Sequence, residues 1–168
     1  AALRVGLVWA GAPPPHIPSA RATDARRSIA LDRFAALSAI PGICFVSLQK
    51  GPGAVQAAQA PAGMTLVDLM AEVDDFSETA AIIHALDLVI TVDTSTAHVA
   101  GALGKPVWVL SRFDACWRWL RDRDDTPWYP SMRLFRQAGP GDWDSVVQRV
   151  GLALESFAAG RARTVDVR

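Results

Sequence analysis

Short apolar runs rich in β-branched residues alternate along the chain with segments that have helical periodicity. Six of these runs are predicted to be strands, at residues 3–9, 43–48, 64–69, 88–92, 107–110 and 132–136. All but the runs at 64–69 and 132–136 are apolar almost throughout instead of alternating. That pattern is typical of parallel strands that are covered on both faces.

Four helical patterns accompany these strands. They are an apolar spacing at 31–37, a capping box at 75–78 that opens a helix to residue 86, a helix from Thr94 to residue 103 that stops at Gly104, and an apolar stripe at 143–157 that ends near Gly160. Residues 11–25 contain four prolines and no periodicity, so a long loop is predicted there. The alternation of strands and helices predicts an α/β, three-layer Rossmann-like sandwich with a mostly parallel sheet of about six strands.

Composition narrows the class of protein. A chain of 168 residues that is 51% hydrophobic and 20% charged is expected to be a single folded domain, residues 1–168. The 17 basic residues balance the 17 acidic ones, which argues against a nucleic-acid partner. No apolar run reaches the roughly 18 residues of a membrane span. The first residues lack a signal peptide and a starting Met, so we expect a fragment of a longer protein.

The two cysteines, Cys44 and Cys116, belong to no Cys/His cluster, and reduced thiols in a cytoplasmic protein are expected. Metal binding is not expected, because His16, His84 and His98 lack ligand spacing.

The candidate chemistry lies where strands end, because ligands of open parallel sheets bind outside the carboxyl ends of the strands. Three segments are expected to converge there: residues 11–28, 47–53 and 91–98. In the third, a strand runs into a helix through Thr94 and Ser95, which offers backbone N–H groups and hydroxyls to an anion, especially a phosphate. His98 is one turn into that helix and can reach the same anion. The alternative is that Thr94 merely caps the helix and His98 is a half-buried structural histidine.

Other motifs are weaker. Neither a P-loop nor a G-x-G-x-x-G follows a strand. Asp122 and Asp124 have the spacing of a metal-binding pair, but a solvated loop is the simpler interpretation. Asp93, Ser95 and His98 could form a hydrolytic triad, yet no G-x-S-x-G elbow supports one.

Arginine and tryptophan side chains add two further candidates. Arg26, Arg27 and Ser28, just ahead of the first predicted helix, could form a second phosphate clamp, or the pair of arginines could simply be solvated. Five of the six tryptophans lie between 108 and 143, where they can stack on a sugar or base or belong to the core.

Read together, several segments are similar to the C-terminal half of heptosyltransferase-like proteins (glycosyltransferase family 9), especially those fused to tetratricopeptide repeats. The specific part is the D-T-S-x-x-H-x-A-G-A-L-G-x-P pattern at residues 93–106; residues 8–11, 27–29, 45–51 and 128–137 support it. The resemblance implies one half of a metal-independent GT-B enzyme that binds a nucleotide diphosphate sugar. It implies that Asp93, Thr94, Ser95 and His98 approach the donor diphosphate, that Arg27 contacts phosphate, and that Gln49 and Lys50 lie near the ribose or base. No cofactor is implied.

Two features depart from the resemblance. Residues 11–15 read Gly-Ala-Pro-Pro-Pro where relatives often have Gly-Asn-Pro, and the chain holds only one of the two GT-B domains. We therefore expect a donor-binding half whose catalytic base lies elsewhere and which is inactive alone. The alternatives are a non-catalytic nucleotide- or sugar-binding module of a repeat-containing scaffold and, less in keeping with the domain size, an isomerase of nucleotide sugars.

Overall fold

A six-stranded, fully parallel sheet forms the centre of the molecule, in a computed structural model that describes residues 2–114 and 116–165. The strand order is β3-β2-β1-β4-β5-β6, the order of a doubly wound Rossmann-like sheet. The strands are β1 (Leu3–Val8), β2 (Ile43–Ser47), β3 (Leu66–Asp68), β4 (Leu88–Val92), β5 (Val107–Ser111) and β6 (Met132–Arg136). All six predicted strands are present, and the fold class is confirmed.

The described residues form four α-helices and four 3₁₀ helices. They are α1 (Pro18–Arg27), η1 (Leu31–Ala39), η2 (Pro52–Gln59), η3 (Met70–Glu72), α2 (Phe76–Ala85), α3 (Ser95–Ala102), η4 (Trp117–Trp119) and α4 (Trp143–Val165). Within the described part of the chain, none of them has both the length and the apolar character that a membrane span needs.

Two hydrophobic clusters, one on each face of the sheet, make the three layers. One joins Val5 and Ile90 to Phe34 of η1 and Val150 of α4. The other joins Val89 and Val109 to Ile83 of α2 and Ala97 of α3. Successive residues of a strand point to opposite faces, so a strand that is covered on both faces is apolar at nearly every position. β4 and β5 are buried at all five positions, as the apolar runs predicted.

Two sequence predictions are wrong in this part of the molecule. Residues 11–25 are not all loop, because α1 occupies Pro18–Arg27; it has no buried residue, so it carries no apolar stripe that periodicity could detect. The last helix does not end near Gly160 but continues to Val165, since the roughly 1 kcal/mol cost of one glycine is tolerated beside good helix formers.

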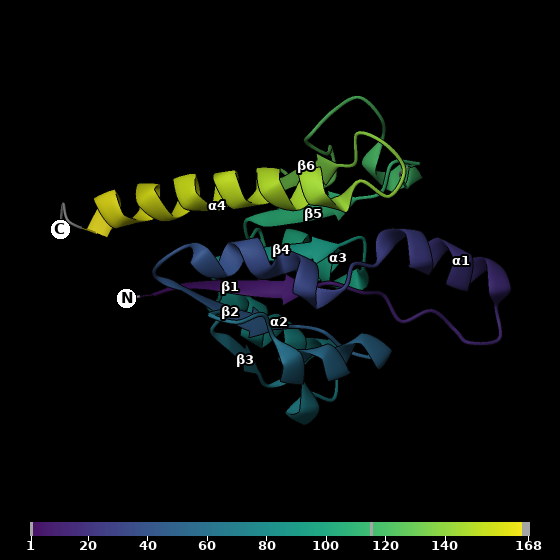
Figure 1. Cartoon of the computed structure of the whole chain (residues 1–168), viewed down its shortest axis with the longest axis horizontal. Coiled ribbons are helices and arrows are strands. Elements are labelled where there is room, and N and C mark those ends of the chain that lie inside the picture. The colour runs from purple at the N-terminus through teal and green to yellow at the C-terminus, as the bar shows by residue number, and fades with distance from the viewer. Residues whose placement is uncertain (1, 115, 166–168) are drawn as a thin grey trace.

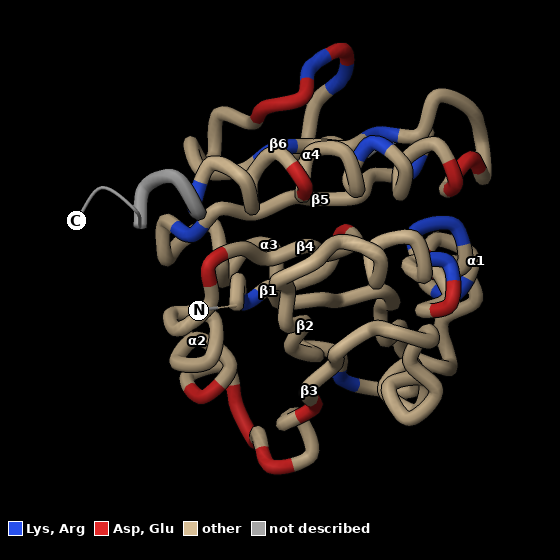
Figure 2. The backbone as a smooth tube through the Cα atoms, turned by 60° about the vertical axis from the view of Figure 1, so that its left-hand side comes forward, with Lys and Arg blue, Asp and Glu red and all other residues tan. Residues whose placement is uncertain are grey.

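The β1–α1 connection places α1 at the edge of the sheet where ligands are expected. Figure 1 shows α1 beyond the arrow tip of β1, at the carboxyl ends of the strands. Ile29 N donates to Trp9 O at 2.8 Å, which ties the end of α1 to the end of β1. Basic residues are frequent in α1, as the blue stretches in Figure 2 show. A basic helix therefore borders this edge.

Candidate functional site

The junction of β4 and α3 opens into a hollow of about 440 Å³ at the carboxyl edge of the sheet. Its walls are Arg27, Asp93, Thr94, Ser95, His98 and Arg118. Five of the eight residues predicted from sequence are therefore brought together by three separate elements, α1, the β4–α3 junction and α3.

A second hollow of about 250 Å³ lies on the other side of the first turn of α3. Gln49 and Lys50 line it, and it shares Arg27, Thr94 and Ser95 with the first hollow. Two more predicted residues thus lie next to the five. The eighth, Ser28, lines neither of these hollows: its hydroxyl donates to Asp24 and accepts from Gly11 N, each at 3.0 Å.

The N-terminus of α3 has no side-chain cap. Thr94 occupies the N-cap position, but its hydroxyl pairs with the hydroxyl of Thr91 at 3.0 Å instead of with an amide of the helix. Helix N-termini expose unpaired N–H groups and a partial positive charge, and a side-chain cap normally satisfies some of them. At α3 the Ala97 N–H donates to the carbonyl of Thr94, and the Ser95 and Thr96 N–H groups are the ones that face an anion at the helix end.

Arg27 is held beside that helix end by two contacts. Its Nε donates to Asp24 Oδ1 and one terminal nitrogen donates to the carbonyl of Asp93, both at 2.8 Å. Gly11 is required for this arrangement, because a Cβ there would lie 1.9 Å from Asp24 Oδ1 and 2.3 Å from the other terminal nitrogen of Arg27. The guanidinium is thereby fixed in position without being removed from the hollow.

The side-chain amide of Gln49 forms hydrogen bonds with the main chain around it. Its side-chain oxygen accepts from Trp9 N and Ala10 N, and its nitrogen donates to the carbonyls of Ala10 and Lys50. It is 1% exposed. Gln49 therefore joins the ends of β1 and β2 and shapes the wall of the second hollow.

Lys50 lies at the edge of the same hollow. It is exposed, and its ammonium group donates to the carbonyl of Val73.

His98 is held between two aromatic rings. It stacks on Trp119 with 5.1 Å between ring centroids, and its Nδ1 pairs with the Tyr129 hydroxyl at 3.1 Å. Gly101 makes room for this contact, because a Cβ there would lie 2.6–2.9 Å from the Tyr129 ring. Burial lowers the pKa of His98 below its ordinary 6.5, with Asp93 raising it and Arg118 lowering it.

The segment Trp117–Trp119 contributes two residues to the candidate site, Arg118 and Trp119, that were not predicted from the sequence. Arg118 lines the first hollow, where it adds a positive charge next to His98. Trp119 is fully buried under the His98 ring, whereas Trp117 and Trp128 are 71% and 59% exposed. The position of Arg118 between Trp117 and Trp119 was the one feature of the sequence that could have drawn attention to it. Sequence alone did not place Arg118 near the N-terminus of α3.

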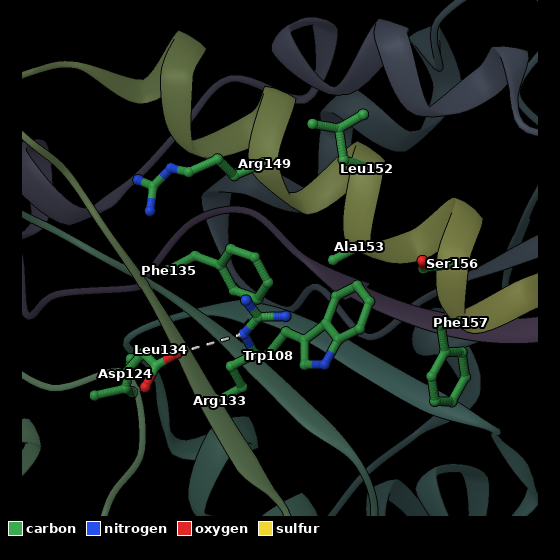
Figure 3. Close-up of a pocket in the computed structure, with 10 residues that line it drawn as sticks. All are labelled: Trp108, Asp124, Arg133, Leu134, Phe135, Arg149, Leu152, Ala153, Ser156 and Phe157. Atoms are coloured by element: carbon green, nitrogen blue, oxygen red, sulfur yellow. Dashed lines mark ion pairs between the residues drawn. The ribbon is translucent and has the colours of Figure 1, made fainter. Parts of the chain in front are cut away.

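A hollow of about 600 Å³ between β6 and α4 contains none of the predicted residues. Figure 3 shows it between Trp108, Phe135 and Phe157, with Arg133 paired to Asp124 at its rim. The Arg133 guanidinium also lies 4.6 Å from the centre of the Phe135 ring. Because the charged groups already have partners and the walls are mainly apolar, this hollow is not our candidate site.

Asp122 and Asp124 do not approach the candidate site. Asp124 pairs instead with Arg133. Within residues 2–114 and 116–165, no three His, Cys, Asp or Glu side chains come together as a metal site would require.

Known proteins resemble this chain in sequence and in fold. The family model of Glycosyltransferase family 9 (heptosyltransferase) matches residues 32–110. Protein FlbA of Caulobacter vibrioides is 32% identical in an alignment of 164 residues that covers 93% of this chain and 26% of FlbA.

Among solved structures, E. coli ADP-heptose lps heptosyltransferase II superposes with a TM-score of 0.63 at 19% identity, over 96% of this chain and 48% of that one. A glycosyl transferase family 9 protein from Veillonella parvula DSM 2008 gives 0.53 at 16% identity, over 92% and 38%. The chain thus spans less than half the length of each of these relatives.

The class of domain defined by this fold is a Rossmann-like α/β unit that matches one half of a heptosyltransferase structure. The family model covers residues 32–110, just under half of the chain, and indicates a likeness to glycosyltransferase family 9 (heptosyltransferase) over that stretch. The resemblance drawn from the sequence is confirmed to that extent. The fusion to tetratricopeptide repeats stays a prediction.

Proposed function

We propose that this chain is the donor-binding half of a metal-independent GT-B glycosyltransferase and that it binds a nucleotide diphosphate sugar. The observation that carries the proposal is the hollow at the uncapped N-terminus of α3, lined by Arg27, Thr94, Ser95 and His98. The family 9 match gives the chemical context.

The diphosphate would lie on the first turn of α3. Backbone N–H groups and the helix dipole favour a doubly charged group there, and Arg27 and Arg118 add formal positive charge from two sides. In a sugar transfer the diphosphate is the leaving group, and fixed donors stabilise the charge that develops on it as the glycosidic bond breaks. Two arginines and a helix end supply that stabilisation without a metal ion.

The nucleoside would extend into the second hollow, beside Gln49 and Lys50. Phe76 and Met70 contribute an apolar wall that suits a planar base. Lys50 would reach a ribose hydroxyl or the base edge.

Transfer itself is proposed for a longer protein. The chain covers 48% of heptosyltransferase II and 26% of FlbA, which leaves room for a facing N-terminal domain, tetratricopeptide repeats or both. Acceptor positioning and the general base would come from that part, so the described chain alone should bind donor without transferring sugar. The two free thiols, Cys44 and Cys116, support a cytoplasmic setting for this proposal. The bacterial sources of FlbA and heptosyltransferase II support a bacterial one.

Calorimetric titration of residues 1–168 with ADP, UDP and GDP and with their sugars tests the proposal. We expect saturable binding of at least one diphosphate, loss of affinity in Arg27→Ala, and no change in the matched control Arg21→Ala, which is exposed on the same helix. No binding by any nucleotide up to about 10 mM, a weak affinity by the standard of specific sites, would contradict it. Robust sugar transfer by this chain alone would contradict the half-enzyme part, while binding without transfer by the longer protein would favour a non-catalytic module.

A further inference from the structure

Tyr129 connects the loop before β6 to the His98 side of the first hollow. Its hydroxyl lies 3.1 Å from His98 Nδ1, and the two rings meet edge to face with 5.8 Å between their centroids. Tyr129 itself lines neither hollow at α3. Any effect of Tyr129 on a ligand there therefore passes through the His98 ring.

The surface of α3 is shaped to receive this tyrosine. Gly101 follows His98 by three residues, which places the two on the same face of the helix. A Cβ at Gly101 would lie 2.6–2.9 Å from three atoms of the Tyr129 ring, so the ring packs directly on the helix backbone. On the other side, Met132 N donates to the Tyr129 carbonyl at 3.0 Å and ties the tyrosine to the start of β6. Tyr129 thus has a fixed place from which its hydroxyl reaches His98.

Trp119 and Tyr129 restrict the His98 ring in different ways. The fully buried Trp119 stacks on it with an angle of 18° between the planes, which sets the plane of the ring. Stacking is compatible with two ring orientations that differ by half a turn about χ2. The hydrogen bond to Tyr129 selects the orientation that brings Nδ1, and not a ring carbon, to the hydroxyl. Nε2 is then the ring nitrogen left for a ligand in the first hollow, and it has no hydrogen-bond partner within residues 2–114 and 116–165.

The position of the ring proton decides what Nε2 can do. Burial lowers the pKa of His98 below its ordinary 6.5, with Asp93 raising it and Arg118 lowering it, so the ring is mainly neutral at pH 7.5. A neutral imidazole has one N–H donor and one acceptor nitrogen. A proton on Nδ1 would leave a lone pair on Nε2, which repels a phosphate oxygen, whereas a proton on Nε2 makes that nitrogen a donor. A hydroxyl that donates to Nδ1 selects the second tautomer.

We propose that Tyr129 is a positioning residue of the diphosphate site: its hydroxyl donates to His98 Nδ1 and keeps the ring proton on Nε2, which donates to a phosphate oxygen. Among the described residues, His98 is the one hydrogen-bond partner of this hydroxyl, so the same contact also satisfies the phenol. The inference rests on the proposed binding of a nucleotide diphosphate. It adds that affinity near neutral pH depends on a residue that does not touch the ligand.

The tautomer of His98 can be observed in the free chain. Long-range ¹H–¹⁵N spectra of residues 1–168 at pH 7.5 report which ring nitrogen carries the proton. We expect the Nε2–H tautomer in the parent chain and a mixture of tautomers in Tyr129→Phe, which removes only the hydroxyl. A parent chain with the proton on Nδ1, or identical His98 ring resonances in the two chains, would overturn the proposal whether or not nucleotides bind.

A double-mutant cycle separates positioning from a structural role. Calorimetry at pH 7.5 would use whichever of ADP, UDP and GDP binds the parent chain most tightly. Tyr129→Phe should weaken this binding about threefold to tenfold, the contribution of one hydrogen bond. In the His98→Ala background the same substitution should change the affinity by less than about twofold, because the ring through which Tyr129 acts is absent.

The results distinguish failure of this inference from failure of the donor site. If the parent chain binds a diphosphate and Tyr129→Phe binds it equally well, or loses the same factor in both backgrounds, Tyr129 does not act through His98 and the donor site stands without it. If the parent chain binds no diphosphate, the proposed function fails and this inference fails with it. Thermal unfolding checks that Tyr129→Phe is folded, and the tautomer of the parent chain provides a test that does not depend on that variant.

Discussion

The N-termini of α2 and α3 have nearly the same backbone geometry and opposite side-chain chemistry. The N-cap residue of α2, Asp75, has φ −140° and ψ 178°, and that of α3, Thr94, has φ −132° and ψ 172°. Asp75 accepts hydrogen bonds from Ser77 N and Glu78 N, at 2.8 and 3.0 Å. Thr94 makes no such bond to α3.

The difference separates a structural helix end from one that is available to a ligand. At α2 the protein provides its own anion, and the hydrogen bonds from Glu78 N and the Ser77 hydroxyl hold the pKa of Asp75 below its ordinary value. At α3 no side chain caps the corresponding turn: Ala97 N donates to the carbonyl of Thr94 at 3.1 Å, and Arg27 and His98 border the Ser95 and Thr96 end of the helix. A side chain that could cap a helix but instead bonds elsewhere is consistent with a site reserved for an external anion.

Replacing the N-cap residue of α3 by an aspartate, as at α2, should produce the largest change in nucleoside diphosphate affinity. Thr94→Asp would place a carboxylate on the first turn, where it satisfies the helix and repels a diphosphate. We expect a loss of about 3 kcal/mol in nucleoside diphosphate binding, with stability raised by about 0.5 kcal/mol, as calorimetry and thermal unfolding would measure. Undiminished binding in this variant would contradict a phosphate site at α3.

Removing His98 tests the other side of the same hollow. His98→Ala should cost about 2 kcal/mol of diphosphate binding, because a charge-assisted hydrogen bond is lost. His84→Ala, at an exposed position of α2, is the control and should bind normally. If His98→Ala binds as tightly as the parent chain, His98 is only a packing partner of Trp119.

Removing the cap of α2 should change stability and not binding. Asp75→Ala leaves Ser77 N and Glu78 N without their acceptor and should lower the free energy of unfolding, as denaturant titration would measure. Diphosphate affinity should stay the same. Asp74→Ala, one residue earlier, serves as the control for the loss of a carboxylate.

The smallest expected effect is the pH dependence of stability and of diphosphate affinity that His98 causes. Burial lowers the pKa of His98 in the folded chain below its ordinary 6.5, so the unfolded chain binds the His98 proton more readily. The contribution of His98 to stability is therefore full above about pH 6.5 and decreases as the pH falls through and below that value.

A diphosphate would favour the protonated ring, so its affinity should rise over the same range of decreasing pH. Binding isotherms at pH 5.5 and 7.5 would measure this change, and His98→Ala should reduce it. A pH dependence that is identical in the parent chain and in His98→Ala would assign it to another group.

Most of the sheet could be predicted because its strands are covered on both faces. β4 has the predicted bounds because all five of its positions are buried and its apolar run ends where the strand does. β6 also has the predicted bounds, although Arg133 and Arg136 interrupt its apolar run. α1 could not be predicted by the same reasoning, because it buries none of its residues and has no stripe to detect.

The candidate site was predictable where one continuous segment carries it. Asp93, Thr94, Ser95 and His98 follow from a strand that runs into a helix. Arg118 was not predictable, because a contact between segments twenty residues apart depends on how the loop after β5 folds over α3. The role of Gln49 also depends on tertiary structure: the sequence indicated a residue near the ligand, whereas its amide is occupied by the main chain of β1 and β2.

The central claim is that the first turn of α3 binds a nucleoside diphosphate, and backbone amide spectra test it most directly. Titration of ¹⁵N-labelled residues 1–168 with ADP, UDP and GDP should shift the Ser95 and Thr96 amide resonances saturably for at least one nucleotide. The Ser77 and Glu78 amides, which Asp75 already caps, should not move. The account is contradicted if Ser95 and Thr96 do not respond, or if the amides of α2 respond equally.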